Sequence, residues 1–115
     1  MIAKALLALG TVALAQCLNP SAWADPVDAQ RLVDVDSEPG AWIAHGRNYA
    51  EDRESPLTSI HPGNVAELGL AWYFDTETTR GLEATPLVFD GVMVFTTSWS
   101  QVFALDLVTG EQLWH

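Results

Sequence analysis

The chain has 115 residues, which is enough for one small domain. It carries 15 Asp and Glu residues against 5 Lys and Arg residues, so its formal net charge is -10. A nucleic-acid-binding protein needs a basic face, and binding to an anionic membrane has the same requirement. The charge therefore argues against both functions and indicates an acidic, water-exposed surface.

The first 24 residues have the order of parts found in secretory signal peptides. Lys4 gives a positive start, an apolar run follows over residues 5–15, and Ala22 and Ala24 supply the small residues that a signal peptidase reads. The apolar run is too short to span a bilayer, which takes about 20 residues. We therefore expect a signal peptide over residues 1–24, cleavage after Ala24, and a periplasmic or secreted mature chain.

Cys17 is the only cysteine, and it lies inside the segment that we expect to be removed. A lipoprotein cysteine is the alternative, but Gln16 stands where a small residue is expected before such a cysteine. Loss of the signal peptide would leave the mature chain without a thiol, a disulfide or a thiolate metal site.

Residues 25–62 contain few periodic signals, and we interpret them as an irregular N-terminal arm. Residues 29–33 can form one or two helical turns. The apolar residues Trp42, Ile43 and Tyr49 stand among turn-forming residues. Segments of this kind usually pack irregularly against a larger body.

The next segment begins with a short helix and a strand. Asn64 is predicted to cap a helix over residues 64–68, with Glu67 reaching back to the Asn64 amide as in a capping box. The apolar and aromatic run over residues 70–74 predicts a strand that is buried on both faces or nearly so.

Four short strands joined by tight turns follow. Asp90-Gly91 stands between two apolar, β-forming runs, and this dipeptide is a strong hairpin signal because both residues must accept a positive φ. Further turns are predicted at residues 98–100 and 106–110. The predicted strands cover residues 85–89, 92–97, 101–105 and 111–115. The fold class is therefore all-β, and a four-stranded antiparallel meander is typical of one propeller blade or one face of a sandwich.

The predicted sheet carries apolar side chains on both faces, and a single sheet cannot cover them by itself. The side chains that need cover are Val88, Val92, Val94, Phe95, Phe103, Leu105 and Trp114. Repeat architectures bury such faces against neighbouring repeats. We therefore expect an incomplete part of a larger fold; the alternative is a small protein that self-associates through its exposed strand edges.

The last predicted turn and strand resemble the tryptophan-docking repeat of quinoprotein propellers. That repeat has the pattern Ala-x-Asp-x-x-Thr-Gly-x-x-x-Trp, which is matched here by Ala104, Asp106, Thr109, Gly110 and Trp114. The Asp and Thr side chains can close the turn by hydrogen bonds, and the Gly allows a positive φ. The Trp then acts as a planar spacer between adjacent blades.

The upstream residues resemble the lead-in of alcohol dehydrogenases that depend on pyrroloquinoline quinone (PQQ). The similar residues are 53–57, 60, 64–65, 68, 70–72 and 80–87. The run Ala84-Thr85-Pro86 is more similar to the quinohaemoprotein alcohol dehydrogenases than to the methanol dehydrogenases. The resemblance covers about residues 40–115, and it identifies residues 63–115 as a PQQ-type propeller segment.

The resemblance implies an eight-bladed β-propeller, of which this chain holds the first blade together with a short N-terminal helix. In the family, PQQ sits on the axis with a calcium ion (Ca2+), and an aspartate acts as general base on the alcohol. Electrons pass from PQQ to cytochrome c or to an attached haem c domain. Glu83 matches the family's glutamate that contacts PQQ from the first blade.

No residue matches the family's calcium ligands, its catalytic aspartate or a Cys-x-x-Cys-His haem site. The resemblance implies that a whole family member oxidises primary alcohols to aldehydes, but this chain lacks the residues that carry out that reaction. We expect this fragment alone to bind neither PQQ nor Ca2+, to be inactive, and to need the remaining blades to cover its sheet.

The remaining candidate residues carry weaker predictions. Arg80 stands close enough to Glu83 to pair with it, although surface pairs contribute little. Trp99 is predicted in a turn, where packing between blades is favoured over a place at the substrate entrance. The histidines are spread without the spacing of metal ligands, and no role is expected for His45, His61 or His115.

A non-enzymatic scaffold or binding module built from PQQ-like repeats is the alternative function. Such scaffolds share the docking repeat, but we expect them to lack the Arg-Gly-x-Glu-Ala-Thr-Pro stretch that is present at residues 80–86. The presence of this stretch favours the dehydrogenase family.

Overall fold

The structure is a computed structural model that describes residues 26–115, so the predicted signal peptide and Cys17 lie outside the described residues. Within residues 26–115, no helix is long and apolar enough to cross a membrane. The helical elements are α1 (Ala29–Val33) and the 3-10 helices η1 (Val35–Ser37), η2 (Val65–Glu67) and η3 (Ser98–Ser100). The strands are β1 (Leu87–Phe89), β2 (Val92–Thr96), β3 (Val102–Asp106) and β4 (Gln112–Trp114).

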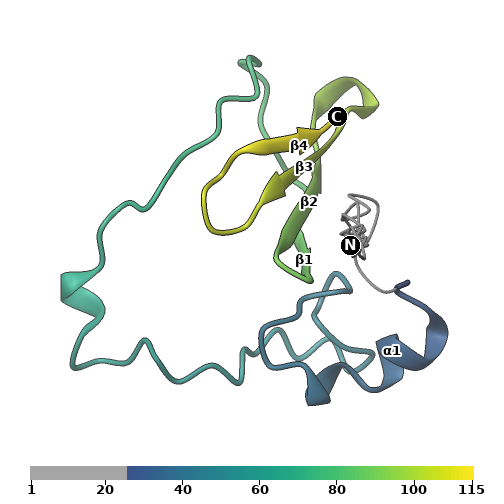
Figure 1. The fold of residues 1–115 in the computed structure, drawn as a ribbon, viewed down its shortest axis with the longest axis vertical. Coiled ribbons are helices and arrows are strands. Elements are labelled where there is room, and N and C mark those ends of the chain that lie inside the picture. The colour runs from purple at the N-terminus through teal and green to yellow at the C-terminus, as the bar shows by residue number, and fades with distance from the viewer. Residues whose placement is uncertain (1–25) are drawn as a thin grey trace, which may run out of the picture.

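The four strands form one antiparallel sheet in the order β1-β2-β3-β4 (Figure 1). The first hairpin turns at Asp90 and Gly91, whose φ angles are 49° and 76°. Both residues therefore adopt the left-handed conformation that the hairpin signal required. The predicted four-stranded meander is confirmed, and the short helix predicted at residues 29–33 is confirmed as α1.

The turn between β3 and β4 is organised by the carboxylate of Asp106. Its Oδ1 accepts hydrogen bonds from the Val108 amide at 3.0 Å, the Thr109 amide at 2.8 Å and the Thr109 hydroxyl at 3.0 Å. These donors, the Thr109 amide first, lower the pKa of Asp106 because they stabilise its ionised form. The Asp-x-x-Thr-Gly pattern thus fixes the turn through local hydrogen bonds.

Trp72 docks on this turn from 35 positions away in the sequence. Its indole Nε1 donates a hydrogen bond to the Leu107 carbonyl at 3.2 Å. The indole also lies against Gly110, where an added Cβ would come within 2.6 Å of the Trp72 ring. Because Gly110 has a φ of 74°, the glycine both permits the turn and leaves room for the indole.

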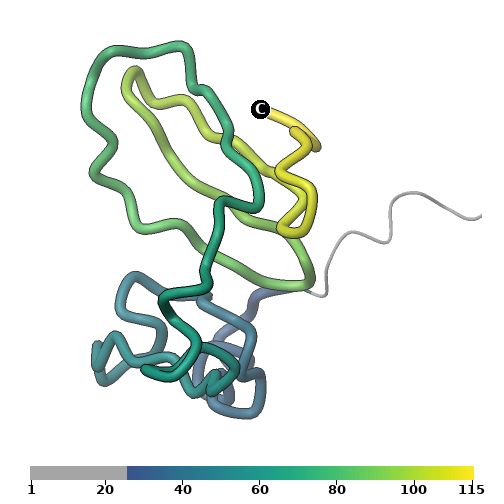
Figure 2. The backbone as a smooth tube through the Cα atoms, turned by 90° about the vertical axis from the view of Figure 1, so that its left-hand side faces the viewer, coloured from purple at the N-terminus to yellow at the C-terminus, as the bar shows by residue number. Residues whose placement is uncertain are grey.

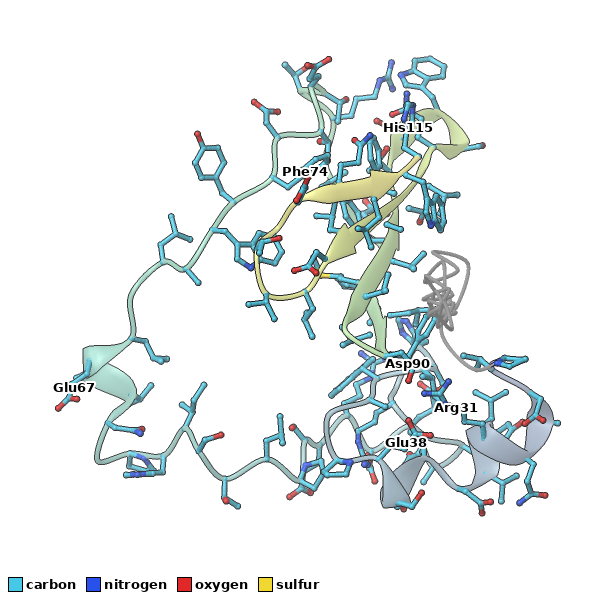
Figure 3. The ribbon with its side chains drawn as sticks, in the orientation of Figure 1. Arg31, Glu38, Glu67, Phe74, Asp90 and His115 are labelled. Carbon is cyan, nitrogen blue, oxygen red and sulfur yellow. The ribbon has the colours of Figure 1, made fainter. Side chains whose placement is uncertain are left out.

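A cluster of aromatic rings covers one face of the sheet beside this contact. Phe95 and Phe103 are paired across β2 and β3 and stack with their centroids 5.6 Å apart. Phe74 meets Phe103 edge-on at 5.3 Å, and His115 stacks on Phe103 at 5.1 Å. Figure 3 shows Phe74 and His115 at the same end of the sheet. The cluster helps to bury β3, whose residues Phe103, Ala104 and Leu105 are among the most buried that the structure describes.

Residues 26–53 form a second small core beside β1. Val35, Ala41 and Ile43 are buried together, and the partly buried Leu32 and Phe89 pack against them. Trp42 exchanges two backbone hydrogen bonds with Val88, at 2.7 and 2.9 Å. Figure 2 shows this N-terminal body gathered at one end of the sheet. The arm therefore pairs with an edge of the sheet that would otherwise be open.

Arg31 joins α1 to the β1–β2 turn, as Figure 3 shows. Its guanidinium donates to both carboxylate oxygens of Glu38, each at 2.8 Å, and to both of Asp90, at 2.9 and 2.7 Å. The hydrogen bonds from Arg31 lower the pKa of Asp90 and of Glu38. Because Arg31 and Asp90 are 59 positions apart, this bidentate pairing fixes the arm against the sheet.

The strand predicted at residues 70–74 is wrong. This segment is extended but lies outside the sheet. Trp72 and Phe74 are partly buried, whereas Leu70 is 81% exposed and Tyr73 is 80% exposed. The aromatic run therefore reflects the docking of alternate side chains on the sheet, and a strand buried on both faces does not form.

The capping box predicted at residues 64–68 is also wrong. Only the short 3-10 helix η2 forms there, without a side-chain cap. Asn64 Oδ1 accepts a hydrogen bond from the His61 amide at 2.9 Å, and its Nδ2 donates to the Ser59 carbonyl at 2.8 Å. The Asn64 side chain therefore closes the preceding turn, and Glu67 lies exposed on a segment that stands away from the sheet (Figure 3).

We predict that Gly110→Ala destabilises the fold strongly. The new Cβ would clash with the Trp72 ring and would also strain the backbone at its positive φ. Together these effects should lower the free energy of unfolding by about 2 to 4 kcal/mol. Urea unfolding followed by tryptophan fluorescence measures the change.

Gly69→Ala is the matched control, because nothing lies within 4 Å of a Cβ added at Gly69. It should change the free energy of unfolding by less than about 0.5 kcal/mol. Equal effects of the two substitutions would contradict the docking of Trp72 on Gly110.

We also predict an acid-dependent loss of stability that comes from Arg31. The pKa of Asp90 and of Glu38 is lower in the folded chain, so the unfolded chain binds protons first as the pH falls. The stabilisation is therefore present above the unfolded pKa of about 4 and is lost as the pH falls through the folded value. Urea unfolding at stepped pH should give a flatter profile for Arg31→Gln than for the unchanged chain.

The pKa of Asp106 is lowered in the unchanged chain and in Arg31→Gln alike. The difference between their two stability profiles therefore reports only on the pairs that Arg31 makes. Identical profiles below about pH 5 would show that the Arg31 pairs do not contribute to stability.

Candidate functional site

Glu83 lies in the extended stretch before β1, with its side chain exposed. This stretch faces the end of β2 and the start of η3 across a recess of about 210 Å³. The recess is lined by Gly81, Leu82, Glu83, Ala84, Thr96, Thr97 and Ser98. Among residues 26–115, no hydrogen bond or ion pair engages the Glu83 carboxylate. The carboxylate is therefore available to a bound molecule.

Thr97 and Ser98, on the wall of the recess opposite Glu83, belong to a strained turn over residues 97–101. The Thr97 amide donates a hydrogen bond to the Gln101 carbonyl at 2.9 Å, which closes the turn. Within it, Trp99 and Ser100 have φ angles of 64° and 59°. Two successive non-glycine residues in the left-handed region are costly, and they persist only where the surrounding structure holds them. Because such strain is concentrated at functional sites, this turn is a candidate part of one.

Two side-chain contacts join this turn to the loop that precedes Glu83. The hydroxyl oxygens of Thr78 and Ser98 are 3.1 Å apart. The Arg80 guanidinium lies over the Trp99 ring, with Cζ 4.6 Å from the ring centroid. A cation in this position is attracted by the electron-rich face of the indole. The pairing of Arg80 with Glu83 that the sequence allowed is not formed among residues 26–115, where the guanidinium lies over the indole instead.

Trp99 itself is 76% exposed. Within the part of the chain that the structure describes, its aromatic face contacts a cation and is not packed in a core. Burial therefore does not account for the position of this indole.

The histidines lie in separate places. His45 Nε2 is 2.9 Å from the Arg53 guanidinium, and its Nδ1 is 2.9 Å from the Thr85 hydroxyl. His61 and His115 belong to a turn and to the aromatic cluster described above. From residue 26 onward, no group of three or more His, Cys, Asp or Glu side chains could hold a metal ion.

Comparison with known proteins identifies the fold to which this sheet belongs. Residues 42–115 match the family model of the β-propeller domain of glucose, ethanol and alcohol dehydrogenases that use PQQ. This chain belongs to the family of PQQ-dependent alcohol dehydrogenases. The predicted family membership is confirmed, and the four-stranded sheet corresponds to part of a quinoprotein propeller.

Two relatives and one solved structure show the extent of the likeness. The chain is 48% identical over 108 residues to quinohemoprotein alcohol dehydrogenase ADH IIB of Pseudomonas putida, across 92% of the chain and 16% of that protein. It is 53% identical over 75 residues to the 1-butanol dehydrogenase (cytochrome c) of Thauera butanivorans, across 65% of the chain and 11% of that protein. The structure of ADHIIG from Pseudomonas putida HK5 matches with a TM-score of 0.74 at 49% identity, across 76% of this chain and 13% of that one.

The family's cofactor can be compared with the recess beside Glu83. PQQ offers carboxylates, quinone oxygens and a pyrrole N–H. The Glu83 carboxylate can accept a hydrogen bond from such an N–H, and the hydroxyls of Thr96 and Ser98 can donate to oxygens. The recess therefore fits as one edge of a cofactor site. The described residues do not fit a calcium site, because they lack a cluster of ligands.

Sequence reasoning reached Glu83 through family resemblance and missed the contacts that organise its surroundings. Ser98 and Ser100 marked a turn, but no signal indicated which residue would contact Trp99. The left-handed conformations at Trp99 and Ser100 could not be anticipated either, because Gly and Asn are the residues usual there.

Proposed function

We propose that residues 63–115 form the first blade of an eight-bladed propeller in a periplasmic, PQQ-dependent alcohol dehydrogenase. In this proposal, the whole enzyme oxidises primary alcohols to aldehydes and passes the electrons to cytochrome c or to an attached haem c domain. The match of residues 42–115 to the propeller family supports it. The names of two relatives, a quinohemoprotein and a cytochrome c-linked dehydrogenase, support the electron acceptor. The predicted signal peptide supports export.

The role of this chain in the proposed enzyme is to hold one edge of the cofactor. Glu83 carries that role, because its carboxylate borders the recess and has no partner among residues 26–115. Thr96 and Ser98 line the opposite wall, where the Thr96 hydroxyl can donate a hydrogen bond, and the Ser98 hydroxyl can do so when it accepts from Thr78. PQQ, when bound, supplies the oxidant that takes two electrons from the alcohol. In this proposal, the calcium ligands and the general base come from other blades.

The sheet also supports an assembly with neighbouring blades. All three residues of β4 are exposed, and the side chain of Trp114 is 44% exposed. An exposed edge strand with apolar side chains is a surface that proteins normally cover. A neighbouring blade would cover it and bury the Trp114 indole.

A chimera tests the proposed function directly. The 115 residues of this chain replace the aligned N-terminal region of ADH IIB, and the remaining blades come from that relative. We expect the chimera to bind PQQ in the presence of Ca2+ and to oxidise a primary alcohol. Glu83→Gln should raise the PQQ concentration for half-reconstitution by about 10- to 100-fold, because a charge-assisted hydrogen bond is lost. Absorbance titration with PQQ measures this concentration.

ADH IIB itself is the control for reconstitution, and its melting temperature is the reference for folding. A chimera that melts cooperatively but takes up no PQQ would contradict the proposal and would favour the non-enzymatic scaffold.

The 115-residue chain by itself should bind no PQQ. Its described residues supply one edge of a site, which leaves most of the cofactor's polar groups without partners. Isothermal titration calorimetry with PQQ and Ca2+ should therefore give only the heat of dilution. A dissociation constant of about 1 μM or tighter would show that the recess is a complete site.

A further inference from the structure

The contact between Arg80 and Trp99 lies beside the recess that contains Glu83. No backbone hydrogen bond holds residues 81–84 to the rest of the described chain. The position of Glu83 therefore depends on how the two ends of this short stretch are attached.

Side-chain contacts attach both ends. On the C-terminal side, the Thr85 hydroxyl lies 2.9 Å from His45 Nδ1. On the N-terminal side, Arg80 lies over Trp99, and Thr78 contacts Ser98 at 3.1 Å. The N-terminal attachment is made to the same strained turn that forms the opposite wall of the recess.

We propose that Arg80 and Trp99 form a latch that positions Glu83 against the wall of the recess. The inference rests on the proposed function, in which Glu83 holds one edge of PQQ. Arg80 and Trp99 are positioning residues, because they act on the cofactor through the placement of Glu83. The left-handed conformation of Trp99 presents an exposed indole to the guanidinium, and that contact fixes the start of the Glu83 stretch.

The chimera with ADH IIB, prepared without PQQ and then titrated with it, provides the test. Arg80→Gln and Trp99→Ala should each raise the PQQ concentration for half-reconstitution by about threefold to tenfold, because each removes the cation–π contact. The double variant should be no worse than either single variant, because the two residues share one contact. At saturating PQQ, the KM for the alcohol should not change. Trp99→Phe keeps an aromatic face and should restore most of the affinity.

Two controls accompany these variants. Glu77→Gln changes a charge in the same loop, and Tyr49→Ala removes a side chain that is 71% exposed in the arm. Neither should alter the titration with PQQ. Arg80→Lys keeps the positive charge but loses the planar guanidinium. This milder variant replaces Arg80→Gln in the test if Arg80→Gln does not fold.

The outcomes separate the latch from the proposed function. If Glu83→Gln weakens PQQ binding but Arg80→Gln and Trp99→Ala do not, the latch is overturned and the cofactor role of Glu83 stands. If Glu83→Gln has no effect, both proposals fail. If Arg80→Gln adds its full effect to that of Glu83→Gln, Arg80 acts independently of Glu83, and the latch is again overturned.

Discussion

The docking of Trp72 on the Asp106–Gly110 turn is the contact on which the rest of this structure depends. It brings a segment from outside the sheet onto the β3–β4 connection. Phe74, two residues further on, then reaches the rings of Phe95 and Phe103. The loop that starts there passes η3 and leads to Glu83, so the placement of the candidate site follows from where the indole rests.

The parts of the fold that the sequence could predict are those decided by neighbouring residues. Asp90-Gly91 and the Asp-x-x-Thr-Gly turn each carry their own φ requirements and hydrogen bonds, and both form as expected. Residues 70–74 and Asn64 had equally clear local signals, but distant contacts or a competing turn prevailed. Glu83 had no local signal, because an exposed carboxylate in an extended stretch is ordinary, and only resemblance to the family marked it.

The arginines show how an acidic chain uses its few cations. Arg31 joins α1 to the sheet through carboxylates, and Arg47 is buried in the arm with Asp36 at 2.7 Å. Arg53 approaches His45, and Arg80 lies over Trp99. Each of these arginines therefore makes a tertiary contact. The 15 Asp and Glu residues far outnumber the cations, so most of the acidic side chains within residues 26–115 have no arginine partner, and the net charge is -10.

The sheet is buried unevenly, and the recess beside Glu83 is one-sided in the same way. β3 is packed on both sides, and the arm pairs with β1 at one edge, but every residue of β4 is exposed. The recess beside Glu83 is similarly one-sided, with a single carboxylate and a few hydroxyls. A cofactor site needs groups that converge from several directions, and in the proposed function this sheet would supply one of them. In the proposed enzyme, the chemistry would therefore require the assembled blades, and the proposed contribution of this chain is the position of Glu83.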